Sequence, residues 1–246
     1  MSSSTRKPSS SSSRRKPLLI SAGVALAAVA LGLVSWQATT PEKAPARTSS
    51  SASAPKASDV HAELAKLARR ASGDKLAVGR VDAPVVLIEY YDFKCGYCGK
   101  FARDTEPELV KKYVEDGTLR IEWRNFPIFG AESEAAARAA WAAGQQDRFP
   151  QFHAAAYAAG AKEKGFGQAR LLELAREAGV PDLERFTKDM AGEEAAAALR
   201  KDQEEGYGIG VSSTPSFLVG GQPVAGAQSF DAFAAAIAQA KARTAK

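Results

Sequence analysis

The hydrophobic pattern divides the chain into a membrane-spanning segment, a linker and a folded domain. Residues 18–36 carry no charged side chain, and as a helix they would extend for about 28 Å, enough to cross the hydrocarbon layer of a membrane. Residues 37–58 are rich in Pro, Ala, Ser and Thr, which is typical of a disordered linker. From residue 59 to residue 246, apolar positions recur with the periods of helices and strands, and this length is ample for one packed domain.

Within the folded domain, the pattern predicts an α/β fold with a helical insertion. The run VVLIEYY is β-branched and aromatic, as expected for a buried strand. In chain order, the predicted elements are a strand at Val85–Tyr91, a helix at Cys95–Gly117 bent at Pro107, a strand at Leu119–Phe126, helices from Glu132 to Glu205, a hairpin at Pro215–Val224 and a helix at Phe230–Ala242. The helical insertion, at about 131–205, therefore lies between the second and third strands. The mixed charges of residues 182–205 are interpreted as a solvated helix face.

The distribution of charge indicates how the chain would lie in a membrane. Residues 1–17 hold five basic residues and no acidic one, which predicts a basic cytoplasmic tail and a folded domain outside the cytoplasm. No small-x-small cleavage motif closes the apolar span, because Trp36 stands where a small residue is needed. We therefore expect a single-pass transmembrane signal-anchor at 18–36. The alternative is a cleaved signal peptide, which would leave the domain secreted.

Charge also excludes one class of partner. The whole chain has 33 Lys and Arg residues against 28 Asp and Glu, and a formal net charge of +5. The five basic residues of the tail account for that excess. The folded domain is therefore formally neutral, without the basic stripe that a nucleic-acid-binding protein needs.

The chain has only two cysteines, and they form the motif CGYC at a predicted helix start. At this spacing the two sulfurs can reach each other. The helix N-terminus favours a thiolate at Cys95, the attacking species in disulfide exchange, and Cys98 would be the resolving thiol. This redox interpretation requires no metal and no cofactor. Two alternatives are a zinc site, which would need the distant His61 and His153, and an inert structural disulfide, which would stabilise little because it closes so small a loop.

One acidic residue, Glu89, interrupts the apolar strand that precedes this motif. It shares a strand face with Val85, Leu87 and Tyr91. In a central strand its carboxyl would be buried, which raises its pKa and costs free energy unless the group has a use. A buried Glu89 could exchange protons with Cys98 during turnover. In an edge strand, Glu89 would simply be solvated.

Three stretches of the chain together resemble the DsbA family of thiol–disulfide oxidoreductases. They are DAPVVLIEYYDFKCGYC, NFPIFG followed by SEAAARAAWAA, and GVSSTPSFLVGG, and they occur in the order found in that family. The resemblance implies a thioredoxin-like fold with an inserted α-helical domain. It also implies that Cys95 is the nucleophile, Cys98 the resolving cysteine and Glu89 the buried acid.

The same resemblance implies further site residues and partners. Pro215 would be a cis-proline facing the disulfide, and Thr214 before it would shape contact with the substrate. The substrates would be exported proteins that contain cysteines. A membrane quinone-linked partner would reoxidise the enzyme.

The dipeptide between the cysteines departs from the pattern of many DsbA-like oxidants, which have Pro-His there. Here it is Gly96-Tyr97, and CGYC is similar to the motif of the disulfide isomerase DsbC. A histidine could help to stabilise a thiolate, whereas Tyr97 cannot carry that charge. We therefore expect a less extreme oxidant, with possible isomerase activity.

The sequence thus leaves two classes of function open. The first is an extracytoplasmic thiol–disulfide oxidoreductase that forms disulfide bonds, or acts as an isomerase or reductase. The second is a non-catalytic chaperone or adaptor of the same fold with a structural disulfide. Apolar residues near the motif, namely Phe93, Tyr97 and Phe101, are candidates to line a groove for unfolded substrate chains.

Overall fold

The computed structural model describes residues 56–244. The predicted cytoplasmic tail, the predicted membrane segment at 18–36 and most of the predicted linker lie outside the described residues. Within residues 56–244, none of the helices has the length and apolar character needed to span a membrane. The predicted linker reached residue 58, but the first helix, α1, already begins at Ala57 and ends at Ala65, because residues 57 and 58 continue its helical pattern.

The centre of the fold is a five-stranded mixed sheet in the order β1-β3-β2-β4-β5. The strands are β1 (Ala77–Val78), β2 (Val85–Tyr91), β3 (Leu119–Asn125), β4 (Ser216–Val219) and β5 (Gln222–Ala225). The two longest, β2 and β3, run parallel, and β4 pairs antiparallel with β2. The strand that leads to the cysteines is therefore central, with a neighbour on each side.

Every residue of β2 is buried, because both faces of the sheet are covered. Val85, Leu87 and Tyr91 belong to the larger hydrophobic cluster, which also contains both cysteines. Val86, Ile88 and Tyr90 belong to a smaller cluster on the opposite face. The alternation follows from the two-residue period of a strand, and it places Glu89 on the face of the cysteines.

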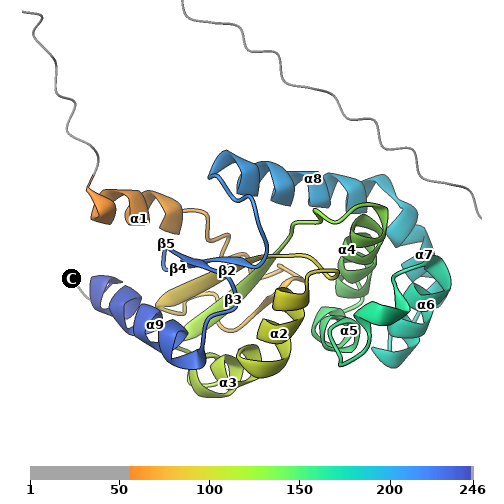
Figure 1. The fold of residues 1–246 in the computed structure, drawn as a ribbon, viewed down its shortest axis with the longest axis horizontal. Coiled ribbons are helices and arrows are strands. Elements are labelled where there is room, and N and C mark those ends of the chain that lie inside the picture. Colours follow the sequence, from red (N-terminus) through yellow and green to blue (C-terminus); the bar gives the residue numbers. More distant parts are fainter. Residues whose placement is uncertain (1–55, 245–246) are drawn as a thin grey trace, which may run out of the picture. The chain divides into compact units, whose positions relative to one another are not determined.

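Helices cover both faces of this sheet, and a group of helices extends beyond it (Figure 1). The face with the cysteines packs against α2 (Gly96–Asp104), α3 (Glu106–Leu109) and α9 (Phe230–Thr244). The other face packs against α1 and α8 (Glu193–Gly208). The helical insertion comprises α4 (Ala131–Gly144), α5 (Phe149–Ala156), the 3-10 turn Lys162–Lys164, α6 (Gln168–Glu177), α7 (Leu183–Ala191) and α8.

The predicted helix after the cysteines is bent, and the bend precedes the expected position. α2 ends at Asp104, Thr105 lies between the two helices, and α3 begins at Glu106. Pro107 causes this break, because it has no N–H and its ring would clash with the carbonyl of the preceding turn. The chain continues through a π-helical turn at Val110–Val114. The break redirects Glu106, which matters for the site described below.

Charged side chains attach α8 to the sheet, which the sequence did not predict. Asp202 of α8 is 3% exposed. It accepts a hydrogen bond from the N–H of Asn125 at 2.9 Å and forms an ion pair with Arg69 at 2.6 Å. Glu205 pairs with Arg124 at 2.8 Å. The interpretation of residues 182–205 as a solvated face is therefore wrong for these two acids, because α8 turns them toward the half-buried Arg69 and the buried Arg124.

Candidate active site

The loop between β2 and α2 is held by one carboxylate, that of Asp92. Its oxygens accept hydrogen bonds from the N–H of Lys94 and Ile128, each at 2.7 Å, and from the hydroxyl of Ser133 at 2.7 Å. Its backbone carbonyl accepts the N–H of Cys95 at 3.0 Å. Asp92 therefore joins the end of β2, the start of α4 and the first cysteine, and it orients Cys95 at the helix start.

Cys95 is the N-cap residue of α2, and its surroundings stabilise a thiolate. Its sulfur accepts the N–H of Cys98 at 3.4 Å, and it lies 3.2 Å from the carbonyl oxygen of Thr214. The Cys98 thiol, the nearby Thr214 and the helix amides lower the pKa of Cys95 to about 6, although burial opposes this shift. The peptide bond between Thr214 and Pro215 is cis, and the contact with the Thr214 carbonyl shows that the loop before β4 lies directly against the first cysteine.

Cys98 differs from Cys95 although it lies one helical turn away. It has no exposed area, whereas Cys95 is 6% exposed. Burial, the hydrogen bond with Cys95 and the nearby Glu89 raise the pKa of the Cys98 thiol well above its ordinary value. Cys95 is therefore a thiolate at neutral pH with a small exposed area, and Cys98 is a fully buried thiol that holds its proton.

Glu89 lies in the central strand with 1% exposure, so the solvated edge position does not apply. It pairs in register with Trp123 of β3 and Phe217 of β4, and its Oε2 atom has no hydrogen-bond partner. Burial, followed by the nearby carboxyl of Glu106, raises its pKa well above the ordinary value. Glu89 is thus a buried, proton-holding acid close enough to Cys98 to affect its pKa.

The two residues between the cysteines face outward. Tyr97 is 68% exposed, and Gly96 lines a cavity of about 100 Å³ beside Cys95, together with Arg103, Tyr157 and Lys162. Phe93 and Phe101, by contrast, are completely buried in the core. Phe101 therefore lines no groove at the cysteines, because α9 covers it. Phe93 packs against α5 but also lines the cavity beside Cys95.

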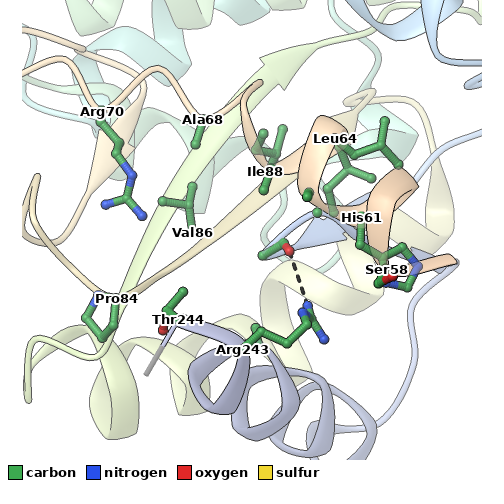
Figure 2. Close-up of a pocket in the computed structure, with 16 residues that line it drawn as sticks. Ser58, His61, Leu64, Ala68, Arg70, Pro84, Val86, Ile88, Arg243 and Thr244 are labelled. Atoms are coloured by element: carbon green, nitrogen blue, oxygen red, sulfur yellow. Dashed lines mark hydrogen bonds between the residues drawn. The ribbon is translucent and has the colours of Figure 1, made fainter. Parts of the chain in front are cut away.

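A larger hollow of about 300 Å³ lies on the opposite face of the sheet, between α1 and α9 (Figure 2). Its lining includes His61 from α1, Val86 and Ile88 from β2, and Arg243 from α9, which donates a hydrogen bond to the carbonyl of Gly220 at 3.2 Å. Neither cysteine lines it. His61 is therefore remote from the sulfurs, so it cannot share a zinc ion with the two cysteines.

Two residues beside Glu89 were not predicted as part of the site. His153 of α5 was considered only as a zinc ligand with the cysteines, and Glu106 not at all. Both are within 4.8 Å of Glu89, measured between ligand atoms, and within residues 56–244 these three form the one group of His, Cys, Asp or Glu side chains close enough to share an ion. A histidine inside an apolar helix was a signal for His153, but nothing in the sequence indicated its neighbours.

The comparisons with known proteins agree with this geometry. The family model described as thioredoxin matches residues 71–239. The chain belongs to the thioredoxin family. Among its relatives, a probable disulfide bond formation protein D of Bacillus anthracis is 32% identical over 151 residues, covering 59% of this chain and 69% of the relative. Within the thioredoxin family, the protein is a DsbA-like thiol–disulfide oxidoreductase.

Other matches of this thioredoxin-family chain extend the comparison. Na(+)/H(+) antiporter NhaA 1 of Salinispora arenicola is 32% identical over 171 residues, which is 68% of this chain but only 24% of the antiporter. The crystal structure of oxidised BdbD from Bacillus subtilis shares the fold, with a TM-score of 0.62, 23% identity and coverage of 69% of this chain and 94% of BdbD. A thioredoxin-like oxidoreductase from Silicibacter pomeroyi has a TM-score of 0.59 and 29% identity, with coverage of 70% and 99%.

Proposed function

We propose that this enzyme forms disulfide bonds in exported proteins, outside the cytoplasm. The observation that carries the proposal is the difference between the two thiols. Cys95 has a pKa of about 6, and burial raises the pKa of Cys98 well above its usual value. Stabilising the Cys95 thiolate favours the reduced enzyme over the disulfide, so the disulfide becomes a better oxidant. It also makes Cys95 a better leaving group when the mixed disulfide is resolved.

The reaction is a pair of exchanges at sulfur. A substrate thiolate attacks Cys95 of the Cys95–Cys98 disulfide, so a mixed disulfide forms and Cys98 leaves as a thiolate, which takes up a proton. A second substrate thiolate then attacks the substrate sulfur of the mixed disulfide and releases Cys95 as a thiolate. The substrate loses two electrons and gains a disulfide, and the enzyme gains those two electrons. In this proposal, Glu89 supplies the proton that Cys98 takes up.

The Cys95 pKa of about 6 supports an oxidant of intermediate strength. This value lies between the pKa of about 7 for the nucleophile of thioredoxin and about 3.5 for that of the most oxidising DsbA proteins. It agrees with the absence of a histidine between the cysteines. The name of the Bacillus anthracis relative, which denotes disulfide bond formation, also favours formation over reduction. Isomerisation uses the same two sulfurs and is the second direction that the CGYC motif supports.

The proposed location and partners derive from the sequence. The charge-free run at 18–36 and the basic residues before it favour an N-terminal anchor with the catalytic domain on the outer side. The substrates would be exported proteins with free cysteines, and a membrane quinone-linked partner would reoxidise the enzyme. N-terminal sequencing of the membrane-bound protein tests the anchor: an intact start supports it, and a start beyond Trp36 indicates cleavage.

The reduction potential of the Cys95–Cys98 pair tests the direction of the reaction. We expect a value between about −270 mV for thioredoxin and about −120 mV for DsbA, measured by equilibration in glutathione buffers. A potential at or below that of thioredoxin would contradict the oxidant assignment and favour a reductant.

Trapping of substrates tests the enzyme against the non-catalytic adaptor. In Cys98→Ala the mixed disulfide at Cys95 lacks its intramolecular resolving thiol, so exported proteins should accumulate as adducts that a reductant releases. Cys95→Ala with Cys98→Ala is the control, because it cannot form the bond. Equal yields of captured protein with both variants would support a non-covalent adaptor instead.

A further inference from the structure

The most unusual feature outside the cysteines is a group of three titratable side chains beneath them, of which two are buried and one, Glu106, is half-buried. Glu89 comes from β2, Glu106 from the first residue of α3 and His153 from α5. The break before Pro107 sets Glu106 at this place, because a straight continuation of α2 would carry it along a different line. Three elements that are distant in sequence therefore converge on a space inside the core.

The polar atoms of this group lack ordinary partners. Four buried atoms here have no hydrogen-bond partner: Glu89 Oε2, Glu106 Oε2, His153 Nε2 and the indole nitrogen of Trp123. Trp123 pairs in register with Glu89 on the neighbouring strand. His153 Nδ1 and Glu106 Oε1 are 3.7 Å apart. Buried polar groups without partners are rare and costly, so their grouping beside a redox pair indicates a role in the reaction.

No cation balances the two carboxyls. Among residues 56–244, neither Glu89 nor Glu106 forms an ion pair with a lysine or arginine, and burial lowers the pKa of His153 to about 3, so the imidazole is neutral. Burial raises the pKa of Glu106 to about 8, and the nearby Trp123 partly offsets that rise. The other titratable groups on the surrounding elements are Tyr91, Asp92, Cys95, Cys98, Tyr157 and Asp202, none of which is a cation.

We propose that Glu106 is a positioning residue for the exchange reaction, sharing protons with Glu89 so that the pair supplies and recovers the proton of Cys98, with neutral His153 completing the group. The proposal rests on the proposed function and deepens it. Two carboxyls so close together cannot both ionise without strong repulsion, so they titrate as a pair. Glu106 raises the pKa of Glu89, so Glu89 keeps its proton at a pH at which it would be partly ionised without Glu106.

The proton balance follows from the exchange steps. When Cys98 leaves as a thiolate, Glu89 donates its proton and becomes a carboxylate, which the protonated Glu106 stabilises by sharing its own. The two sulfurs hold the two electrons from the substrate, and the carboxyl pair has lost one proton. When a partner reoxidises the enzyme, Cys98 returns that proton as it re-forms its bond to Cys95.

Carboxyl titration followed by infrared absorption tests the pair without reference to activity. The wild type should show two protonated carboxyls that ionise in separate steps, the earlier one near the pKa of about 8 for Glu106 and the later one, that of Glu89, at higher pH. Glu106→Gln should leave one step, at lower pH than the later wild-type step, because the neighbouring negative charge is gone. Glu108→Gln is the matched control, since it removes an exposed carboxyl from the same helix. An unchanged Glu89 step in Glu106→Gln would overturn the proposal.

The pH profile of disulfide reduction tests the link to the reaction. In stopped-flow reduction of the enzyme by a dithiol, Glu106→Gln should move the profile to lower pH by about one unit and slow the reaction about three- to tenfold at pH 7.5. Glu108→Gln should match the wild type. A uniform loss of rate without a change in the profile would indicate a structural role only. If the wild type lacks exchange activity, the proposed function fails, while the titration still reports on the pair.

The same three side chains also form a candidate cation site, which makes metal binding the competing outcome. If the group holds protons, adding zinc should not change the unfolding temperature of the wild type, reduced or oxidised, any more than it changes that of Glu106→Gln. A zinc-dependent rise in the wild type that is lost in both Glu89→Gln and Glu106→Gln would identify a metal site instead. That result would overturn the proton-sharing role.

Discussion

At the scale of single residues, the chemistry depends on an asymmetry between two identical side chains. Cys95 caps α2 and receives the N–H of Cys98, whereas Cys98 has no exposed area. Alkylation of the reduced protein with iodoacetamide should therefore proceed at Cys95 with a midpoint near its pKa of about 6. Cys98 in Cys95→Ala should react far more slowly at neutral pH. Similar midpoints for the two thiols would contradict the assignment of nucleophile and resolving cysteine.

Tyr97 offers a second prediction at this scale. Its side chain is 68% exposed, so replacing it should leave the core intact. Tyr97→His should lower the pKa of Cys95, because an imidazolium beside a thiolate stabilises it. It should therefore raise the reduction potential, by about 30 mV for each tenfold shift of the thiol–disulfide equilibrium toward the reduced enzyme. Tyr97→Gln is the uncharged control. The effect should weaken above the histidine pKa, and identical potentials for the two variants would refute it.

At the scale of elements, the local pattern predicted the strands well and the helix bend less well. β2 occupies Val85–Tyr91 as predicted, and β3 ends at Asn125, one residue before the predicted end. β2 was predictable because burial on both faces gives an apolar run that only Glu89 interrupts, and β3 because its apolar residues alternate with charged ones at the two-residue period of a strand. The break was expected at Pro107 but lies at Thr105. The reason is that a proline disturbs the helical turn before it rather than its own position.

The β4–β5 turn yields a prediction about close packing. Gly221 has φ = +82°, and a Cβ atom there would overlap the carbonyl oxygen of His61 in α1. Gly210 has φ = +84° but nothing within 4 Å of such an atom. Gly210→Ala should cost about 1 kcal/mol from backbone strain alone. Gly221→Ala should cost more, at least ~3 kcal/mol, because α1 must also move. Denaturant unfolding measures both, and equal losses would show that α1 yields freely.

At the scale of the whole molecule, a buried ionic network joins β3 to α8 and to the chain after α1. Glu122 has no exposed area and receives hydrogen bonds from the N–H groups of Arg69 and Arg70 and from the side chains of Arg120 and Arg124, at 2.8–2.9 Å. Burial alone would raise the pKa of Glu122, but these donors outweigh it and hold the pKa at about 2.

This network predicts how stability depends on pH. Because the folded pKa of Glu122 lies below its ordinary value of 4.5, its stabilisation is complete above pH 4.5 and is lost as the pH falls toward 2. Glu122→Gln should lower the free energy of unfolding by about 3–5 kcal/mol at neutral pH, and its acid dependence should be shallower. Glu194→Gln, at an exposed position, is the control. Urea unfolding from pH 2 to pH 7 measures both, and parallel acid slopes for Glu122→Gln and wild type would contradict the prediction.

The sequence alone determined the redox centre and its setting, because those features are local. A buried strand, a short loop and a helix that begins with CGYC are contiguous in the chain, so the hydrophobic pattern and spacing suffice to place Cys95 at a helix N-terminus. Glu89 could also be found, since a carboxyl inside an apolar strand is conspicuous.

Only the tertiary structure decided which groups surround that centre. Glu106 and His153 reach Glu89 from helices that the sequence does not relate to β2. Asp202 and Glu205 reach arginines at the sheet from a helix whose charges look solvent-exposed in sequence. The physical reason is that local patterns reflect which face of an element is apolar, whereas the partner of a buried charge depends on how distant elements pack. The cysteines therefore follow from the sequence, and the proton chemistry proposed for them follows from the fold.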